Sequence, residues 1–111
     1  LVRSVPVSEH VARYASALAR ATRPGDETAS DRVREWVRWG AGPRAGQYLL
    51  LAAKAHAVLE GRFTVSCHDV RQFVLPVLRH RVFRNFAAAS EGIDAEEIVR
   101  RVLDETSEPN Y

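Results

Sequence analysis

The stretch GAGPRAG, residues 40–46, places an arginine at the head of a long apolar run. Pro43 suits the first position of a helix, because its missing N–H would have no partner there. Arg44 would then lie in the first turn, where the helix dipole already presents positive charge and an arginine is unfavourable. Gly42 has no side chain that could cap the free N–H groups. An uncapped helix N-terminus beside a guanidinium is a natural phosphate site, although first-turn arginines without a ligand also occur.

Other residues that could act as nucleophiles, bases or metal ligands are few and scattered. Cys67, His68 and Asp69 are adjacent, but neighbouring residues of a helix face different directions, so they cannot form a catalytic triad. Zinc requires four ligands, and no second pair accompanies Cys67 and His68 at a useful spacing. The histidines form no HxxxH pair; they are His10, His56, His68 and His80. GAGPRAG also lacks the Lys-Ser/Thr ending of a phosphate-binding loop, so the chain alone predicts no catalytic or metal site.

Basic residues gather in a second region, around the sequence LRHR. Arg79, His80 and Arg81 lie within it, and Arg71 and Arg84 flank it. Such a cluster binds an anionic partner in some proteins and forms a solvated face in others. It defines the alternative that the sequence leaves open, a helical protein- or nucleic-acid-binding module that uses these side chains. The net charge of only +2 and the acid-rich C-terminal stretch make nucleic acid the weaker choice.

Length and composition are typical of one soluble globular domain. The chain has 111 residues, of which 46% are hydrophobic and 27% are charged. No apolar run approaches the ~20 residues that cross a membrane. The single cysteine, Cys67, excludes an internal disulfide and favours a reducing compartment, so we expect a cytoplasmic protein. The start at Leu1, without methionine, suggests a piece of a longer protein.

Hydrophobic periodicity and capping residues predict an all-α domain, a compact bundle of about five helices. The expected helices follow Ser8, span residues 30–40, span residues 43–60, follow Ser66 and follow Asp94. At most one minimal short strand pair is expected, from the extended segments 62–65 and 81–86.

Three local features of these helices lead to further predictions. Trp36 and Trp39 should share one face of the second helix, more as core and hinge anchors than as a ligand cage. The third helix is apolar around most of its circumference, so we expect it to be buried on most sides and to stop at Gly61. Pro76 should kink the fourth helix near residue 75 or end it early.

Several motifs, taken in order, resemble the C-terminal lid of MoxR-family AAA+ ATPases. That family typically carries a G-A-S-P-R-A stretch, an alanine-rich helix ending in G-R, a V-x-x-x-D-V helix start and an L-R-H-R sequence. This chain has Gly40-Ala41-Gly42-Pro43-Arg44-Ala45, then Gly61-Arg62, Val65 with Asp69-Val70, and Leu78-Arg79-His80-Arg81. Residues 11–24 are also similar to the family's first lid helix, so the resemblance covers nearly the whole chain.

The resemblance implies that residues 1–111 are a single helical lid of a larger AAA+ ATPase. The core that binds ATP and Mg²⁺ would precede Leu1, and the chain alone would hydrolyse nothing. Arg44 corresponds to the family's sensor 2 arginine, which reaches from the lid to the γ-phosphate of ATP in the core. The flanking motif residues are Gly42, Pro43 and Ala45, and the candidate contacts to a neighbouring subunit or partner are Arg79, His80 and Arg81.

The resemblance also implies an assembly and a set of partners. Members form rings, commonly hexamers, and act as chaperone-like proteins that remodel or activate client protein complexes. Proteins with von Willebrand factor A domains are frequent partners, and neither a membrane nor a nucleic acid is expected. One residue departs from the family's stretch, because Gly42 stands where serine, a stronger helix N-cap, is usual. The turn before Arg44 should therefore be more permissive.

Overall fold

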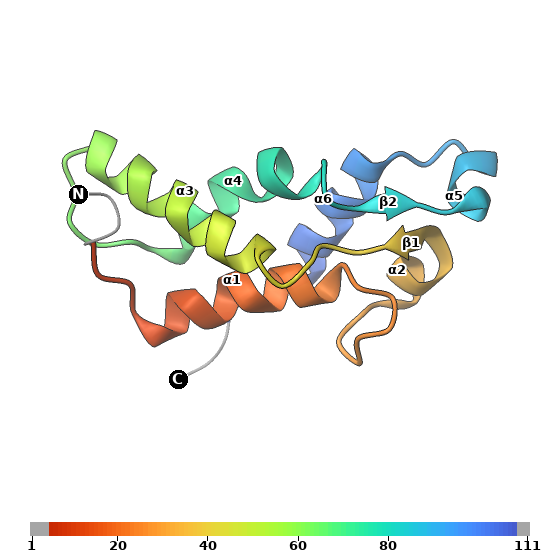
Figure 1. Ribbon diagram of the computed structural model, residues 1–111, viewed down its shortest axis with the longest axis horizontal. Coiled ribbons are helices and arrows are strands. Elements are labelled where there is room, and N and C mark those ends of the chain that lie inside the picture. Colours follow the sequence, from red (N-terminus) through yellow and green to blue (C-terminus); the bar gives the residue numbers. More distant parts are fainter. Residues whose placement is uncertain (1–4, 109–111) are drawn as a thin grey trace.

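The computed structural model of the protein describes residues 5–108, which form six α-helices and one two-stranded antiparallel sheet (Figure 1). In chain order the elements are α1 (Glu9–Ala21), α2 (Asp31–Trp36), β1 (Val37–Trp39), α3 (Ala45–Leu59), α4 (Cys67–Leu78), β2 (Phe83–Arg84), α5 (Phe86–Ser90) and α6 (Ala95–Glu105). This mainly helical bundle with a minimal strand pair confirms the predicted fold class. The helix that sequence reasoning missed is α5, whose 5 residues are too few to show a helical period.

Polar side chains cap the starts of four of the five predicted helices. Ser8, Ser30 and Ser66 each accept a hydrogen bond from the backbone N–H three residues later, and Asp94 does the same for α6. At Ser66 the arrangement is reciprocal, because the Asp69 side chain accepts from the Ser66 backbone N–H and completes a capping box. These bonds satisfy N–H groups that a helix leaves without partners, so the local sequence determines where these four helices begin.

Helix α3 begins two residues later than predicted. The Gly42 carbonyl accepts a hydrogen bond from the Ala45 N–H at 3.1 Å, which folds Pro43 and Arg44 into a turn ahead of the helix. Pro43 is therefore not the first helical residue, and Arg44 occupies the N-cap position instead of the first turn. The predicted end at Gly61 is confirmed, since its φ of 74° is one that glycine adopts without strain.

The predicted burial of α3 on most of its sides is wrong. Helix α3 packs against α1 and α4, and its buried residues recur every fourth position, so they form a single stripe. That stripe consists of Ala45, Leu49, Ala53 and Ala57. Tyr48 and Leu51 are exposed, and Leu59 is 86% exposed. An apolar composition all round the helix therefore reflects a second apolar face that the described residues leave uncovered.

The segment predicted as the second helix, residues 30–40, divides into α2 and β1. Strand β1 pairs antiparallel with β2, which lies in the predicted extended segment 81–86, whereas residues 62–65 form no strand. Asn85 fastens the end of β2 to the end of α2. Its N–H donates to the Trp36 carbonyl at 2.8 Å, and its side-chain amide donates to the Glu35 carbonyl at 2.6 Å. The partner of β1 is distant in sequence, so the local pattern of residues 30–40 could not reveal it.

A β-bulge separates the directions of the two tryptophans. Between the pairs formed by Val37 and Trp39, strand β1 has one residue more than β2, namely Arg38. Trp36 is 3% exposed at the end of α2, whereas Trp39 is 62% exposed. The prediction that both share one helix face is wrong, and only Trp36 is a core anchor.

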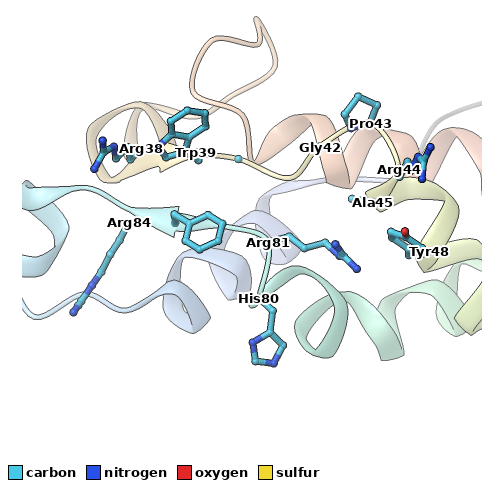
Figure 2. A pocket seen from close by; sticks show the side chains of 12 residues that line it. Arg38, Trp39, Gly42, Pro43, Arg44, Ala45, Tyr48, His80, Arg81 and Arg84 are labelled. Carbon is cyan, nitrogen blue, oxygen red and sulfur yellow. The ribbon is translucent and has the colours of Figure 1, made fainter.

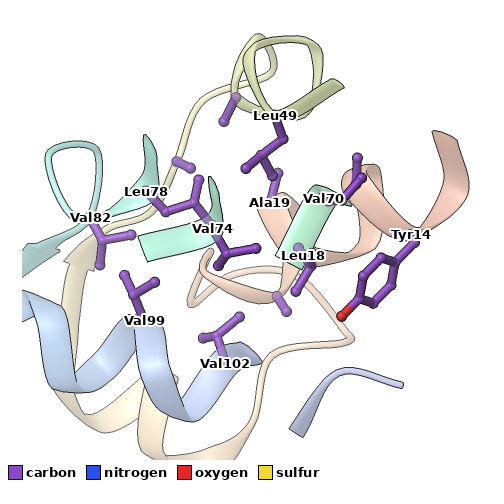
Figure 3. Packing of buried hydrophobic residues seen from close by; sticks show 14 of the residues in the cluster. Tyr14, Leu18, Ala19, Leu49, Val70, Val74, Leu78, Val82, Val99 and Val102 are labelled. Atoms are coloured by element: carbon purple, nitrogen blue, oxygen red, sulfur yellow. The ribbon is translucent and has the colours of Figure 1, made fainter. Parts of the chain in front are cut away.

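The core lies where α1, α3 and α4 meet, and it continues to α6 (Figure 3). Figure 3 shows Leu18, Leu49, Val74 and Val99 pointing into it, one from each of these four helices. Helix α4 continues past Pro76 to Leu78, so the proline does not end the helix at residue 75. One continuous hydrophobic cluster thus holds α3 in a fixed position.

Candidate functional site

An open groove of about 1000 Å³ lies between the turn before α3, the β1–β2 ribbon and the segment that follows α4 (Figure 2). Its lining includes the four arginines Arg38, Arg44, Arg81 and Arg84, together with His80 and the aromatic residues Trp39, Tyr48 and Phe83. Among residues 5–108, no aspartate or glutamate lines it. A concave, positively charged and partly aromatic surface of this kind suits an anionic ligand or partner.

The groove brings together most of the residues singled out from the sequence. Gly42, Pro43, Arg44 and Ala45 line it from one side, and His80 and Arg81 line it from the segment after α4. These last two are separated from the GPRA stretch by the whole of α3 and α4, so sequence alone did not place them beside it. Arg79 does not line the groove, and its Nε donates to Nε2 of His80 at 3.3 Å.

The alternative basic cluster is divided by the fold. Arg71 donates from Nη1 to the hydroxyl of Tyr14 at 2.9 Å, so it lies against α1 rather than in the groove. Burial raises the pKa of the Tyr14 phenol, and the hydrogen bond from Arg71 opposes that rise. Arg81 and Arg84 line the groove, whereas Arg79 lies beside it against His80 and Arg71 lies against Tyr14.

Arg44 has no electrostatic partner within residues 5–108. It is exposed, its backbone is in the right-handed helical region at φ −82° and ψ −11°, and its side chain makes no capping hydrogen bond. No carboxylate of the described chain forms an ion pair with its guanidinium. A guanidinium that is free beside an uncapped helix start is available to an oxyanion from another domain.

The turn that carries Arg44 is held against the end of α1. The hydroxyl of Thr22 accepts from the Ala41 N–H at 2.9 Å, and Nε of Arg23 donates to the Ala41 carbonyl at 2.7 Å. Gly40 approaches the same backbone so closely that a Cβ added to it would lie 2.4 Å from the Thr22 carbonyl oxygen. These contacts fix the start of the turn before Arg44, while the Arg44 side chain itself stays free.

The other end of α3 is fixed by the buried carboxylate of Asp69, for which the sequence predicted no charged partner. Asp69 is fully buried, and it accepts two hydrogen bonds from Arg62, at 2.8 Å from Nη1 and 2.6 Å from Nη2. His56 of α3 and the Ser66 backbone N–H complete its surroundings, at 3.1 and 2.9 Å. The pKa of the Asp69 carboxyl is lowered, chiefly by Arg62 and against the effect of burial. The sequence offers one signal for this pair, the order of the Gly61-Arg62 and Asp69-Val70 motifs, but that order does not show that the side chains of Arg62 and Asp69 contact each other.

Metal-ligating atoms meet in two places within the described chain, and both lie outside the groove. Ligand atoms of His10, Cys67 and Glu108 lie within 4.8 Å of one another, but burial raises the pKa of the Cys67 thiol and so favours its protonated form. The second group includes Asp69, whose oxygens already accept from Arg62. Neither group therefore enters the candidate site.

Within residues 5–108, none of the helices combines the length and the apolar character that a membrane span requires.

Comparison with known proteins gives matches over most of the chain. Residues 29–102 match the family model described as the AAA lid domain. The chain is 33% identical over 96 residues to Chaperone MoxR1 of Mycobacterium tuberculosis, a match that covers 86% of this chain and 26% of that protein. It is 49% identical over 47 residues to Protein MoxR of Paracoccus denitrificans, covering 42% of this chain and 14% of the relative.

A solved structure agrees over nearly the full length of the chain. The crystal structure of a candidate ATPase from Cytophaga hutchinsonii superimposes with a TM-score of 0.90 at 28% identity, covering 98% of this chain and 33% of that one. The chain thus spans about a third or less of each of these proteins. The family model covers the central and C-terminal helices, the groove and α3, and the helical fold is the one expected of such a domain. The chain therefore belongs to the AAA lid domain family.

Proposed function

We propose that this chain is the lid of a MoxR-type AAA+ ATPase and that Arg44 supplies a cation to the γ-phosphate of ATP bound in the ATPase core. The observation that carries the proposal is the free guanidinium of Arg44 on a firmly held turn, at the edge of a groove without acidic residues. ATP and Mg²⁺ belong to the core, and the lid contributes this one charge. The residues around Arg44 fit a phosphate, because no carboxylate of the described lining competes for the guanidinium.

Arg44 would couple the nucleotide to the position of the lid. A guanidinium that contacts the terminal phosphate is attracted to the core when that phosphate is present and loses the contact when it leaves. Because Arg44 directly precedes α3, and α3 is packed against α1 and α4, the same force acts on the whole lid. ATP hydrolysis in the core would thereby change the orientation of the lid in a ring of subunits, commonly a hexamer.

The larger assembly follows from the same proposal. The name Chaperone MoxR1 supports a chaperone-like role in which the ring remodels or activates client protein complexes, with von Willebrand factor A domain proteins among its partners. His80 and Arg81 lie in the groove beside Arg44, and Arg79 lies next to His80, so these three side chains are candidate contacts to a neighbouring subunit or partner. The single cysteine is consistent with a cytoplasmic location.

The test is the substitution Arg44→Ala in the full-length ATPase. We expect the rate of ATP hydrolysis to fall about 10- to 100-fold, which corresponds to losing one charge-assisted contact in the transition state. Arg44→Lys should recover part of the rate, because it keeps the charge but loses the planar fork of the guanidinium. Arg100→Ala is the matched control, since Arg100 is an exposed arginine on α6 that pairs with Glu96.

The folding control uses the 111-residue chain. The Arg44 side chain makes no hydrogen bond or ion pair with the described residues, so Arg44→Ala should change the free energy of unfolding of this chain by less than about 0.5 kcal/mol. Unchanged ATP hydrolysis in the Arg44→Ala protein, with normal nucleotide binding, would exclude the sensor role.

A further inference from the structure

A pair of exposed aromatic side chains marks the β1–β2 ribbon. Trp39 and Phe83 are partners in the register of the two strands, and they are 62% and 57% exposed. Cross-strand partners lie about 5 Å apart at Cβ, so the two exposed side chains start next to one another on the ribbon. Single exposed apolar residues are ordinary, but two large aromatic residues side by side on a short ribbon expose an area that water hydrates poorly.

Two arginines flank this aromatic pair. Arg38 is the extra residue of the bulge, and Arg84 is the partner of Val37. The Arg38 side chain has no hydrogen bond or ion pair within the described chain, and the Arg84 side chain donates to a neutral acceptor, the Ile93 carbonyl, at 2.8 Å. Both charges are therefore uncompensated. We call Arg38, Trp39, Phe83 and Arg84 the ribbon patch.

The ribbon patch lies apart from Arg44 within the groove. Figure 2 shows Arg38, Trp39 and Arg84 at one end, and Arg44 and Tyr48 at the other. The guanidinium of Arg81 lies between these ends and stacks on the ring of Tyr48, with its Cζ 4.4 Å from the ring centroid. A phosphate held by Arg44 would leave the aromatic rings of the ribbon available to a different partner.

We propose that the ribbon patch binds an acidic segment of another protein, one that carries a large apolar side chain between its carboxylates. The apolar side chain packs on Trp39 and Phe83, and the carboxylates bind the flanking guanidinium groups through paired hydrogen bonds. Tryptophan and arginine are the residue types enriched at the centres of protein interfaces, where lysine is depleted. This inference does not depend on the role of Arg44.

The charge distribution favours a protein over a nucleic acid. Nucleic-acid affinity comes mainly from many phosphate contacts along an extended basic surface. This chain has a net charge of only +2, and its basic residues are divided between the groove and other faces, as the contact of Arg71 with Tyr14 shows. A short acidic segment requires only the few arginines that the groove supplies.

The experiment is a selection of random peptides of about 12 residues displayed on phage, with the 111-residue chain immobilised. We expect the enriched sequences to contain several Asp or Glu residues around a Leu, Phe or Trp. Fluorescence anisotropy with a synthetic copy of an enriched peptide then measures its affinity. Trp39→Ala and Arg38→Glu should each weaken binding about tenfold or more, and added salt should weaken it further.

Matched variants separate the ribbon patch from general charge effects. Arg13→Glu changes the net charge by the same amount as Arg38→Glu, but Arg13 lies on α1 and pairs there with Glu9, so binding should change less than about twofold. If Trp39→Ala alters the far-UV circular dichroism spectrum, Arg38→Glu decides the question, because its side chain is exposed and makes no contact that the fold needs.

Three results would overturn the proposal. Selection could return no enriched sequences, or sequences without acidic residues. Enriched peptides could bind equally well to the Arg38→Glu and Arg13→Glu chains. Finally, oligothymidylate of about 12 nucleotides could bind more tightly than the peptide and be lost in the same variants, which would assign the ribbon patch to nucleic acid instead.

Discussion

Gly40 and Gly42 precede Arg44 in the same turn, and their surroundings place different demands on them. A side chain at Gly40 would collide with the backbone at Thr22 and Arg23, whereas no atom lies within 4 Å of a Cβ built on Gly42. Gly40 is needed for close packing of the turn on α1. Gly42 is not, so the serine that is usual in the family fits at position 42 without displacement.

At the scale of single residues, we predict that replacing Gly40 or Gly42 by alanine changes the free energy of unfolding in opposite directions. Gly40→Ala should destabilise the chain by about 2–3 kcal/mol, because the new methyl group forces the turn away from α1. Gly42→Ala should stabilise it by roughly 0.5 kcal/mol, because alanine reduces the conformational freedom of the unfolded chain. Urea unfolding of both variants measures the two effects. Equal free energies of unfolding would show that the turn is not packed as described.

Helix α3 shows at the scale of one element what the sequence could predict. Gly61 was correctly recognised as its end, because the requirement for a positive φ is local. Its predicted start is two residues too early. A proline suits both the first position of a helix and a turn before it, and only the hydrogen bond between Gly42 and Ala45 shows that Pro43 lies in the turn. Its degree of burial was wrong, since composition does not reveal how many neighbours a helix has.

The candidate site was only partly accessible to sequence reasoning for the same reason. Arg44 was identified from its position after Gly42-Pro43 and from the family motif. The aromatic pair of Trp39 and Phe83 was not, because strands distant in the sequence create it and a bulge directs Trp39 outward. Local signals thus predicted the residues at helix ends, and long-range pairing created the rest of the groove.

The junction between α3 and α4 leads to a prediction about pH. The pKa of Asp69 in the folded chain lies below its unfolded value of about 3.9, so the ionised carboxylate stabilises the fold above that pH. This contribution is complete above about pH 5 and is lost as the pH falls through the unfolded pKa toward the folded one. Asp69→Asn should lower the free energy of unfolding at pH 7 by about 2 kcal/mol.

The difference in the free energy of unfolding between the wild-type chain and Asp69→Asn should then become smaller as the pH is lowered from 5 to 2. Urea unfolding at a series of pH values measures it. Asp26→Asn is a suitable comparison, because the pKa of Asp26 is also lowered, by hydrogen bonds from Thr28, but its side chain lies in a loop outside this junction. A difference for Asp69→Asn that stays constant over this range would contradict the assignment of the ionised pair with Arg62.

At the scale of the whole molecule, the two ends of the structure share one core. Helices α1, α3 and α4 make up one end, and α2, the ribbon and α5 make up the other (Figure 1). Helix α6 contacts α1, α2 and α4, and the buried cluster includes residues of both ends. The indole of Trp36 joins the second end to the loop after α5, because it donates to the Glu91 carboxylate at 3.0 Å.

We therefore predict that the chain unfolds in a single transition. Far-UV circular dichroism reports mainly the unfolding of the long helices. Once Trp39 is replaced by phenylalanine, the fluorescence of Trp36 reports the unfolding of the end formed by α2, the ribbon and α5. The two thermal midpoints should agree within about 1 °C, as expected for a cooperative domain of this size. A lower thermal midpoint for the Trp36 fluorescence would show instead that α2 and the ribbon unfold as a separate unit.

Helix α3 is fixed to the rest of the lid at both ends, so it transmits a rotation of the lid along its whole length. Its 15 residues span about 22 Å at 1.5 Å per residue, with Arg44 at one end and the Arg62–Asp69 pair just beyond the other. If the whole lid pivots near Arg44 by about 10°, the far end of α3 moves by about 4 Å. A displacement of this size at Leu59 and Phe63, both largely exposed, is comparable to the width of a side chain. A small change in the angle of the lid at Arg44 would thus be sufficient to make or break contacts at the opposite tip of the domain.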